Sequence, residues 1–65
     1  MKIEYKVFLI EKTKRVFLRG FDQYQKACDY CRENKKQDPT VHFLITAYSI
    51  REKAPLSMYQ KQIVF

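Results

Sequence analysis

The chain has 65 residues, and 13 Lys and Arg against seven Asp and Glu give it a net charge of +6 at pH 7. This length predicts one domain over residues 1–65, with a small core that buries only about 60% of the surface of the unfolded chain. The apolar content of 46% excludes a disordered chain of low hydrophobicity. No apolar run approaches the roughly 20 residues that span a bilayer, and none is typical of a secretory signal. We therefore expect no membrane partner.

Apolar and polar residues alternate over residues 3–10, which predicts a β-strand. Residues 11–14 are polar and are expected to form a four-residue loop, with residues 15–19 as the returning strand of a hairpin. The register set by this loop places Phe8 opposite Phe17 as a cross-strand aromatic pair.

The same register pairs Val7 with Leu18 and Lys6 with Arg19. It makes one face of the hairpin apolar throughout, and a slip by one residue would mix both faces. We expect the helix described next to cover this apolar face, whose residues are Ile3, Tyr5, Val7, Leu9, Val16 and Leu18.

A helix is predicted over residues 22–36. Asp22 is expected to be its N-cap, with Gln25 three residues later completing a capping box. Pro39 makes continuation of the helix unfavourable. Apolar side chains recur at spacings of three and four along one side: Tyr24, Ala27, Cys28 and Cys31.

The most apolar segment is residues 40–50, which carries apolar side chains on both faces and predicts an interior strand. Residues 51–57, around Pro55, are expected to form a turn. The C-terminal residues 58–65 are predicted to form the last strand.

These elements predict the fold class α+β. The expected architecture is a small two-layer ββαββ domain, with one helix packed on one face of a four-stranded, mostly antiparallel sheet. The two-sided third strand favours the strand order 2-1-3-4. A β-grasp-like order 2-1-4-3 is the alternative.

The sequence indicates no catalytic site and no cofactor. Cys28 and Cys31 form a C-x-x-C pair, but Cys28 lies well inside the predicted helix, on its apolar side, whereas a redox cysteine needs the helix N-terminus. A zinc site needs four ligands, and His42, the single histidine, would supply only a third. We expect both cysteines to pack in the core as reduced thiols, which favours a cytoplasmic location.

The second face of the hairpin is the candidate functional surface. It combines the Phe8–Phe17 pair with cations, and one helix can cover only one face of a small sheet. Three hypotheses follow. The aromatic rings stack on unpaired bases, they form a protein contact that includes a homodimer, or Ile50, Met58 and Tyr59 fold over them.

We therefore expect a non-enzymatic binding module. The favoured partner is nucleic acid, and the alternative is an acidic protein surface or a second copy of the chain. The candidate contact residues include the cationic hairpin tip and are Lys6, Phe8, Lys12, Lys14, Arg15, Phe17 and Arg19.

Overall fold

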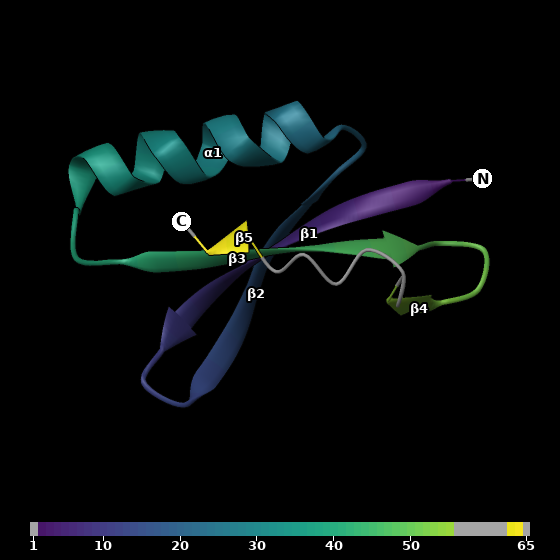
Figure 1. Cartoon of the computed structure of the whole chain (residues 1–65), viewed down its shortest axis with the longest axis horizontal. Helices are drawn as coiled ribbons and strands as arrows, with labels where there is room; N and C mark the ends of the chain where they lie inside the picture. Colours follow the sequence, from purple (N-terminus) through teal and green to yellow (C-terminus); the bar gives the residue numbers. More distant parts are fainter. Residues whose placement is uncertain (1, 56–62, 65) are drawn as a thin grey trace.

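The computed structural model describes residues 2–55 and 63–64. Along the chain, one hairpin precedes the helix, a long strand follows it, and two short strands complete the sheet (Figure 1). The elements are β1 (Ile3–Glu11), β2 (Lys14–Phe21), α1 (Tyr24–Gln37), β3 (His42–Ser49), β4 (Ala54–Pro55) and β5 (Ile63–Val64).

The strand order is β2-β1-β3-β4, and every pairing is antiparallel. This confirms the predicted α+β class and the order 2-1-3-4, and it excludes the β-grasp-like order. β3 lies inside the sheet between β1 and the C-terminal strands, as its two-sided apolar pattern predicts. Its residues Phe43, Leu44 and Ile45 are buried in succession, so both faces of β3 are covered.

The C-terminal part of the sheet differs from the prediction. Ala54 and Pro55, expected in a turn, form β4 and pair with Ser49 and Tyr48. Proline is tolerated there because an edge strand leaves one side of its backbone without a partner. Of the last strand predicted over residues 58–65, only Ile63–Val64 lies within the described residues, and it pairs with β3.

The helix α1 follows the predicted span closely, but its N-terminal cap differs. The N-cap residue is Gln23, with no side-chain hydrogen bond to the first turn, so the predicted capping box of Asp22 and Gln25 is wrong. The Asp22 carboxylate instead pairs with Lys26 Nζ at 3.2 Å. Among the described residues, no helix is long and apolar enough to cross a bilayer.

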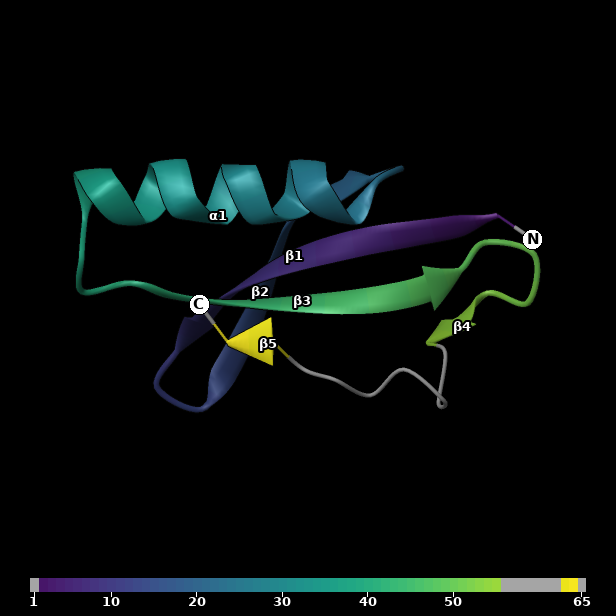
Figure 2. The ribbon, with the colours of Figure 1, turned by 45° about the horizontal axis from the view of Figure 1, so that its top comes forward.

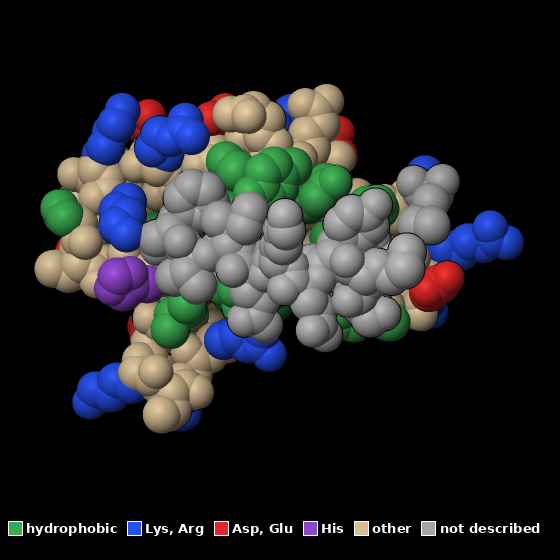
Figure 3. Space-filling model, viewed as in Figure 1, with side chains coloured by type: hydrophobic (Ala, Val, Ile, Leu, Met, Phe, Trp, Pro, Cys, Tyr) green, Lys and Arg blue, Asp and Glu red, His purple; other side chains and the backbone are tan. Residues whose placement is uncertain are grey.

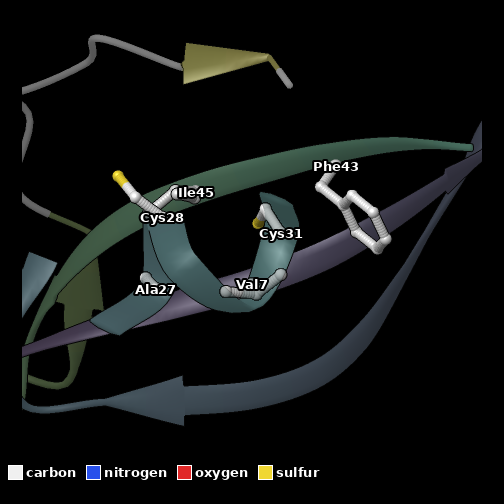
Figure 4. Close-up of a cluster of buried hydrophobic side chains, with 6 residues drawn as sticks. All are labelled: Val7, Ala27, Cys28, Cys31, Phe43 and Ile45. Atoms are coloured by element: carbon white, nitrogen blue, oxygen red, sulfur yellow. The ribbon is translucent and has the colours of Figure 1, made fainter. Parts of the chain in front are cut away.

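The core lies between α1 and the two central strands β1 and β3 (Figure 2). Figure 4 shows the side chains of its members, which come from these three elements. The fully enclosed side chains include Val7 from β1, and Ala27 and Cys31 from α1. The complete cluster is Val7, Ala27, Cys28, Cys31, Phe43 and Ile45.

The hairpin register agrees with the prediction near the turn and departs from it further along. Phe8 pairs with Phe17, as expected. A β-bulge then shifts the register, so that Val7 pairs with Arg19 rather than with Leu18, and Lys6 no longer lies opposite Arg19. Leu18 is the extra residue on β2, and such an insertion bends the strand and reorients the side chains beyond it.

The helix covers less of the hairpin than the sequence predicts. The distal half of the hairpin projects away from α1 in both ribbon views (Figures 1 and 2). The helix reaches β2 only near its end, where the Phe21 and Tyr30 rings lie 5.4 Å apart. Val16 and Leu18, expected beneath the helix, therefore remain 41% and 38% exposed.

The turn of the first hairpin contains backbone strain that a substitution can test. The loop has two residues, Lys12 and Thr13, rather than the predicted four, because Glu11 pairs with Lys14. Lys12 has φ of 50°, in the left-handed region, where a residue with a Cβ is disfavoured by roughly 1–2 kcal/mol.

We predict that Lys12→Gly stabilises the domain by about 0.5 kcal/mol, because relief of the strain exceeds the extra freedom of glycine in the unfolded chain. Thermal unfolding followed by circular dichroism should show a midpoint roughly 2–4 °C higher. Thr13→Gly is the matched control and should lower the midpoint, since Thr13 does not have a positive φ. An equal decrease in both variants would contradict the interpretation.

Candidate functional site

A cluster of aromatic and cationic side chains lies on the sheet face opposite α1. The buried Val7 points toward α1, so the alternation of β1 turns Lys6 and Phe8 the other way. We call this cluster the aromatic face. It consists of Lys6, Phe8, Arg15, Phe17 and Tyr48.

The centre of the aromatic face is the Phe8–Phe17 pair. Its ring centroids lie 5.7 Å apart with an interplanar angle of 64°, an edge-to-face arrangement. Phe8 is half-buried, whereas Phe17 is 52% exposed. Full burial of a phenylalanine is worth about 1.5–3 kcal/mol, so this exposure costs a small domain a substantial part of its stability. Phe17 is therefore the best-placed side chain of the face for an intermolecular contact.

Two cations lie close to the rings of this face. Lys6 Nζ is 3.6 Å from the centroid of the Tyr48 ring and 5.6 Å from that of Phe17. The Arg15 guanidinium carbon is 5.7 Å from the centroid of Phe8. Cation–π contacts of this kind are worth about 0.5–1 kcal/mol at exposed sites. They hold positive charge beside the aromatic surface.

Glycine at position 20 shapes the surroundings of Lys6. Gly20 lies opposite Lys6 in the sheet, and a Cβ on Gly20 would lie 2.5 Å from Glu4 Oε2. The missing side chain thus lets the Glu4 carboxylate lie across the strand pair, where its Oε1 is 3.9 Å from Lys6 Nζ. Glu4 partly neutralises Lys6. Within residues 2–55, Arg15 has no carboxylate within ion-pairing distance.

Arg19, which the sequence placed on this face, lies on the other one. The bulge puts Arg19 opposite Val7, and its guanidinium carbon lies 4.9 Å from the centroid of the Phe21 ring. Phe21 packs against the core beneath α1. Arg19 is thus separated from Phe8 and Phe17 by the thickness of the sheet.

The remaining candidate residues, Lys12 and Lys14, are exposed at the hairpin tip. Neither forms an ion pair with a described residue. Figure 3 shows that Lys and Arg side chains spread over the hairpin tip, the helix and the far end of the molecule instead of gathering in one patch. The tip therefore lies next to the aromatic face without being part of it, since Lys14 alternates with Arg15 along β2 and points to the other side.

Sequence reasoning missed Tyr48 as a member of the aromatic face. Tyr48 pairs with Glu4 across β1 and β3, and this places its ring beside Lys6. Alternation within residues 40–50 separates Tyr48 from the core residues Phe43 and Ile45. The register between β1 and β3, which brings Tyr48 to Lys6, has no signal in the sequence, because no short loop connects these strands.

The cysteine pair is buried, as predicted. Cys28 and Cys31 are free thiols, 6% and 0% exposed, in the core beneath α1 (Figure 4). His42 is exposed and pairs with Ile10. It lies on the sheet face turned away from α1, whereas the cysteines lie beneath α1. Among the described residues, no group of three His, Cys, Asp or Glu side chains is placed to hold a metal ion.

Comparisons of the chain with protein-family models, with curated proteins and with solved structures give no match.

The buried Cys31 thiol predicts a dependence of stability on pH. Burial, and secondarily the neighbouring Cys28, raises the pKa of Cys31 to about 11 from its ordinary value of 9.0. Above pH 9 the unfolded chain loses this proton first, so the stabilisation is complete below pH 9 and is lost as the pH approaches 11. The expected loss is on the order of 2 kcal/mol.

Urea unfolding between pH 8 and pH 11 measures this loss. Cys31→Ala is the control, because it retains the other titrating groups and lacks this thiol. Its stability should decrease less steeply with pH than that of the wild type. Parallel curves for the two proteins would show that Cys31 does not contribute.

Proposed function

We propose that this chain is a non-enzymatic module that binds single-stranded nucleic acid on its aromatic face. The observation that carries the proposal is the 52% exposure of Phe17 at the centre of a surface flanked by Lys6 and Arg15. The net charge of +6 supports a polyanionic partner. The free thiols Cys28 and Cys31 support a reducing, cytoplasmic setting.

Each part of the aromatic face has a role in this proposal. A base stacks on Phe17, and such stacking is worth about 1–3 kcal/mol per base and tolerates any base. Arg15 binds a neighbouring phosphate, since no described carboxylate competes for its charge. Lys6 contributes less, because Glu4 and the Tyr48 ring already engage its ammonium.

The hairpin tip extends the proposed contact along the strand. Lys12 and Lys14 lie beyond Arg15 on the projecting part of the hairpin, and their side chains are exposed. A nucleic-acid backbone that passes Phe17 toward the tip would meet further cations. These contacts add affinity without sequence preference.

The two arginines of β2 provide a matched pair for testing the proposal. We predict that Arg15→Ala weakens binding of a single-stranded oligonucleotide about three- to tenfold at low salt, and that Arg19→Ala leaves it nearly unchanged. Both changes remove one positive charge from the same strand, but only Arg15 lies on the aromatic face. Fluorescence anisotropy with labelled poly-dT and poly-U oligonucleotides measures the affinity.

The salt dependence gives a second measurement of the same contact. Loss of one phosphate contact should reduce the slope of log K against log salt by about 0.7 for Arg15→Ala. Equal effects of the two arginine variants would indicate non-specific attraction to net charge. No binding by the wild type at low salt would reject the proposal.

A protein contact is the second candidate function, and one observation favours it. Val16, Phe17 and Leu18 are consecutive residues of β2, and all are exposed. A run of this kind is typical of association surfaces. A homodimer through the aromatic face would bury Phe17. Ile50, one of the three residues expected to cover this face, is 47% exposed. The hypothesis that Met58 and Tyr59 cover the face concerns positions outside the described residues.

Phe17→Glu separates the two functions. If the face binds nucleic acid, the variant keeps the mass of the wild type in light scattering and loses oligonucleotide binding, because a carboxylate repels phosphate and removes the stacking ring. If the face forms a homodimer, the wild type scatters as a dimer and Phe17→Glu as a monomer. Circular dichroism controls for folding of the variant.

A further inference from the structure

The outer edge of β2 is an unpaired strand edge beside the aromatic face. β2 is the end strand of the sheet, and no described residue pairs with its outer side. We propose that this edge accepts an acidic, extended segment of another protein as an added β-strand. Such strand addition combines backbone hydrogen bonds with contacts to alternate side chains.

The backbone groups at this edge can be assigned from the ladder. The Ile50 N–H donates to the Lys2 carbonyl, so the even-numbered residues of β1 exchange hydrogen bonds with β3. The odd-numbered residues of β1 therefore bond to their partners on β2, which include Val16, opposite Leu9. On β2, Lys14 and Val16 are therefore bonded to β1. Arg15 and Phe17 alternate with them, so their N–H and C=O groups point outward, away from β1.

Apolar side chains flank these outward groups on both faces of β2. Phe17 lies on the aromatic face, and Val16 lies on the face of α1 but beyond the reach of the helix. Leu18, the bulge residue, adds to this exposed run. An added strand would place its alternate side chains beside Phe17 on one face and beside Val16 on the other. Edge strands of natural proteins usually avoid such a run, because it invites pairing.

The charge of β2 decides which strand it would accept. Lys14, Arg15 and Arg19 are its charged residues, and β2 contains no carboxylate. A second copy of β2 would add the same cations and no carboxylate, so its charge does not complement this edge. Acidic side chains in the added strand would meet these cations instead. Nucleic acid lacks the alternating amide N–H and carbonyl groups that would pair with the outward backbone.

The bulge limits the straight part of the edge to residues 14–17. Only two residues with outward backbone groups lie in this stretch, so the added segment needs about four to six residues in register. The proposal can be tested separately from nucleic-acid binding, because strand addition requires the outward backbone groups of β2, whereas the proposed function requires only side chains of the aromatic face.

The test uses an acetylated, amidated eight-residue peptide in which glutamate alternates with valine, added to the full chain labelled with nitrogen-15. We expect shifts of the Arg15 and Phe17 amide resonances and at least tenfold slower hydrogen exchange of these two amides. The same peptide with N-methyl groups on alternate amides cannot complete the ladder and should bind at least fivefold more weakly. Its lysine–valine counterpart should not bind.

Two variants at one position separate the edge from the aromatic face. Phe17→Ala and Phe17→Pro both remove the ring, and only Phe17→Pro removes the outward N–H, which an edge strand tolerates. Phe17→Pro should bind the peptide about fivefold more weakly than Phe17→Ala, whereas both variants should lose oligonucleotide binding equally. Circular dichroism reports whether each variant folds, and the N-methylated peptide provides the test if Phe17→Pro does not.

Three results would overturn the proposal. Equal binding of the N-methylated and unmodified peptides would show that the edge backbone is not used. Slower exchange of the Arg15 and Phe17 amides on raising the protein concentration alone would identify a second copy as the occupant. Slower exchange with an oligonucleotide and not with the acidic peptide would assign this edge to nucleic acid as well.

Discussion

The structure depends on one constraint, which is that a single helix of 14 residues shields one face of a sheet much larger than itself. The helix packs over β1 and β3, where Val7 and Ile45 meet Ala27 and Cys31. This arrangement uses the small side chains of the helix to bring it close to the sheet. The projecting hairpin and the face opposite α1 lie outside its reach, so aromatic side chains remain accessible there.

The β-bulge determines which side chains share the accessible surface. Before the bulge, Arg15 and Phe17 point to the aromatic face, and without the insertion Arg19 would follow them. The extra residue, Leu18, sends Arg19 to the face of Phe21 instead. The bulge thus divides the cations of β2 between two surfaces. It also shortens the straight edge of the sheet, which limits uncontrolled pairing between chains.

The sequence predicts much of this fold, because periodicity reports on local structure. It predicts β1, β2, α1 and β3 to within a few residues, and the two-sided pattern of β3 places that strand inside the sheet. The pairing of Phe8 with Phe17 is predicted correctly, because the predicted loop of residues 11–14 and the observed loop of residues 12–13 give the same register near the turn. The bulge at Leu18 has no such signal, since residues 16–18 are all apolar and none of them marks the position of the extra residue.

The errors about the site follow from tertiary geometry that local sequence patterns do not reveal. Val16 and Leu18 have the alternation of core residues, yet the distal half of the hairpin projects away from α1 (Figure 1). Tyr48 joins the aromatic face only through the register between β1 and β3. The absent capping box has a comparable cause, because Asp22 engages Lys26 in an ion pair and leaves the first turn of α1 uncapped.

The two cations of the aromatic face differ in how far their charge is available to a ligand, and composition does not show this difference. Lys6 is engaged on two sides, by the Glu4 carboxylate and by the Tyr48 ring, so an incoming anion must compete with both. Arg15 contacts only the Phe8 ring among these partners and keeps its planar guanidinium available for a phosphate or a carboxylate. A ligand therefore gains most binding energy from contacts with Arg15 and Phe17, which lie close together on β2. The aromatic face and the outer edge of β2 meet at residues 15–17, so ligands of the two surfaces would compete for this segment.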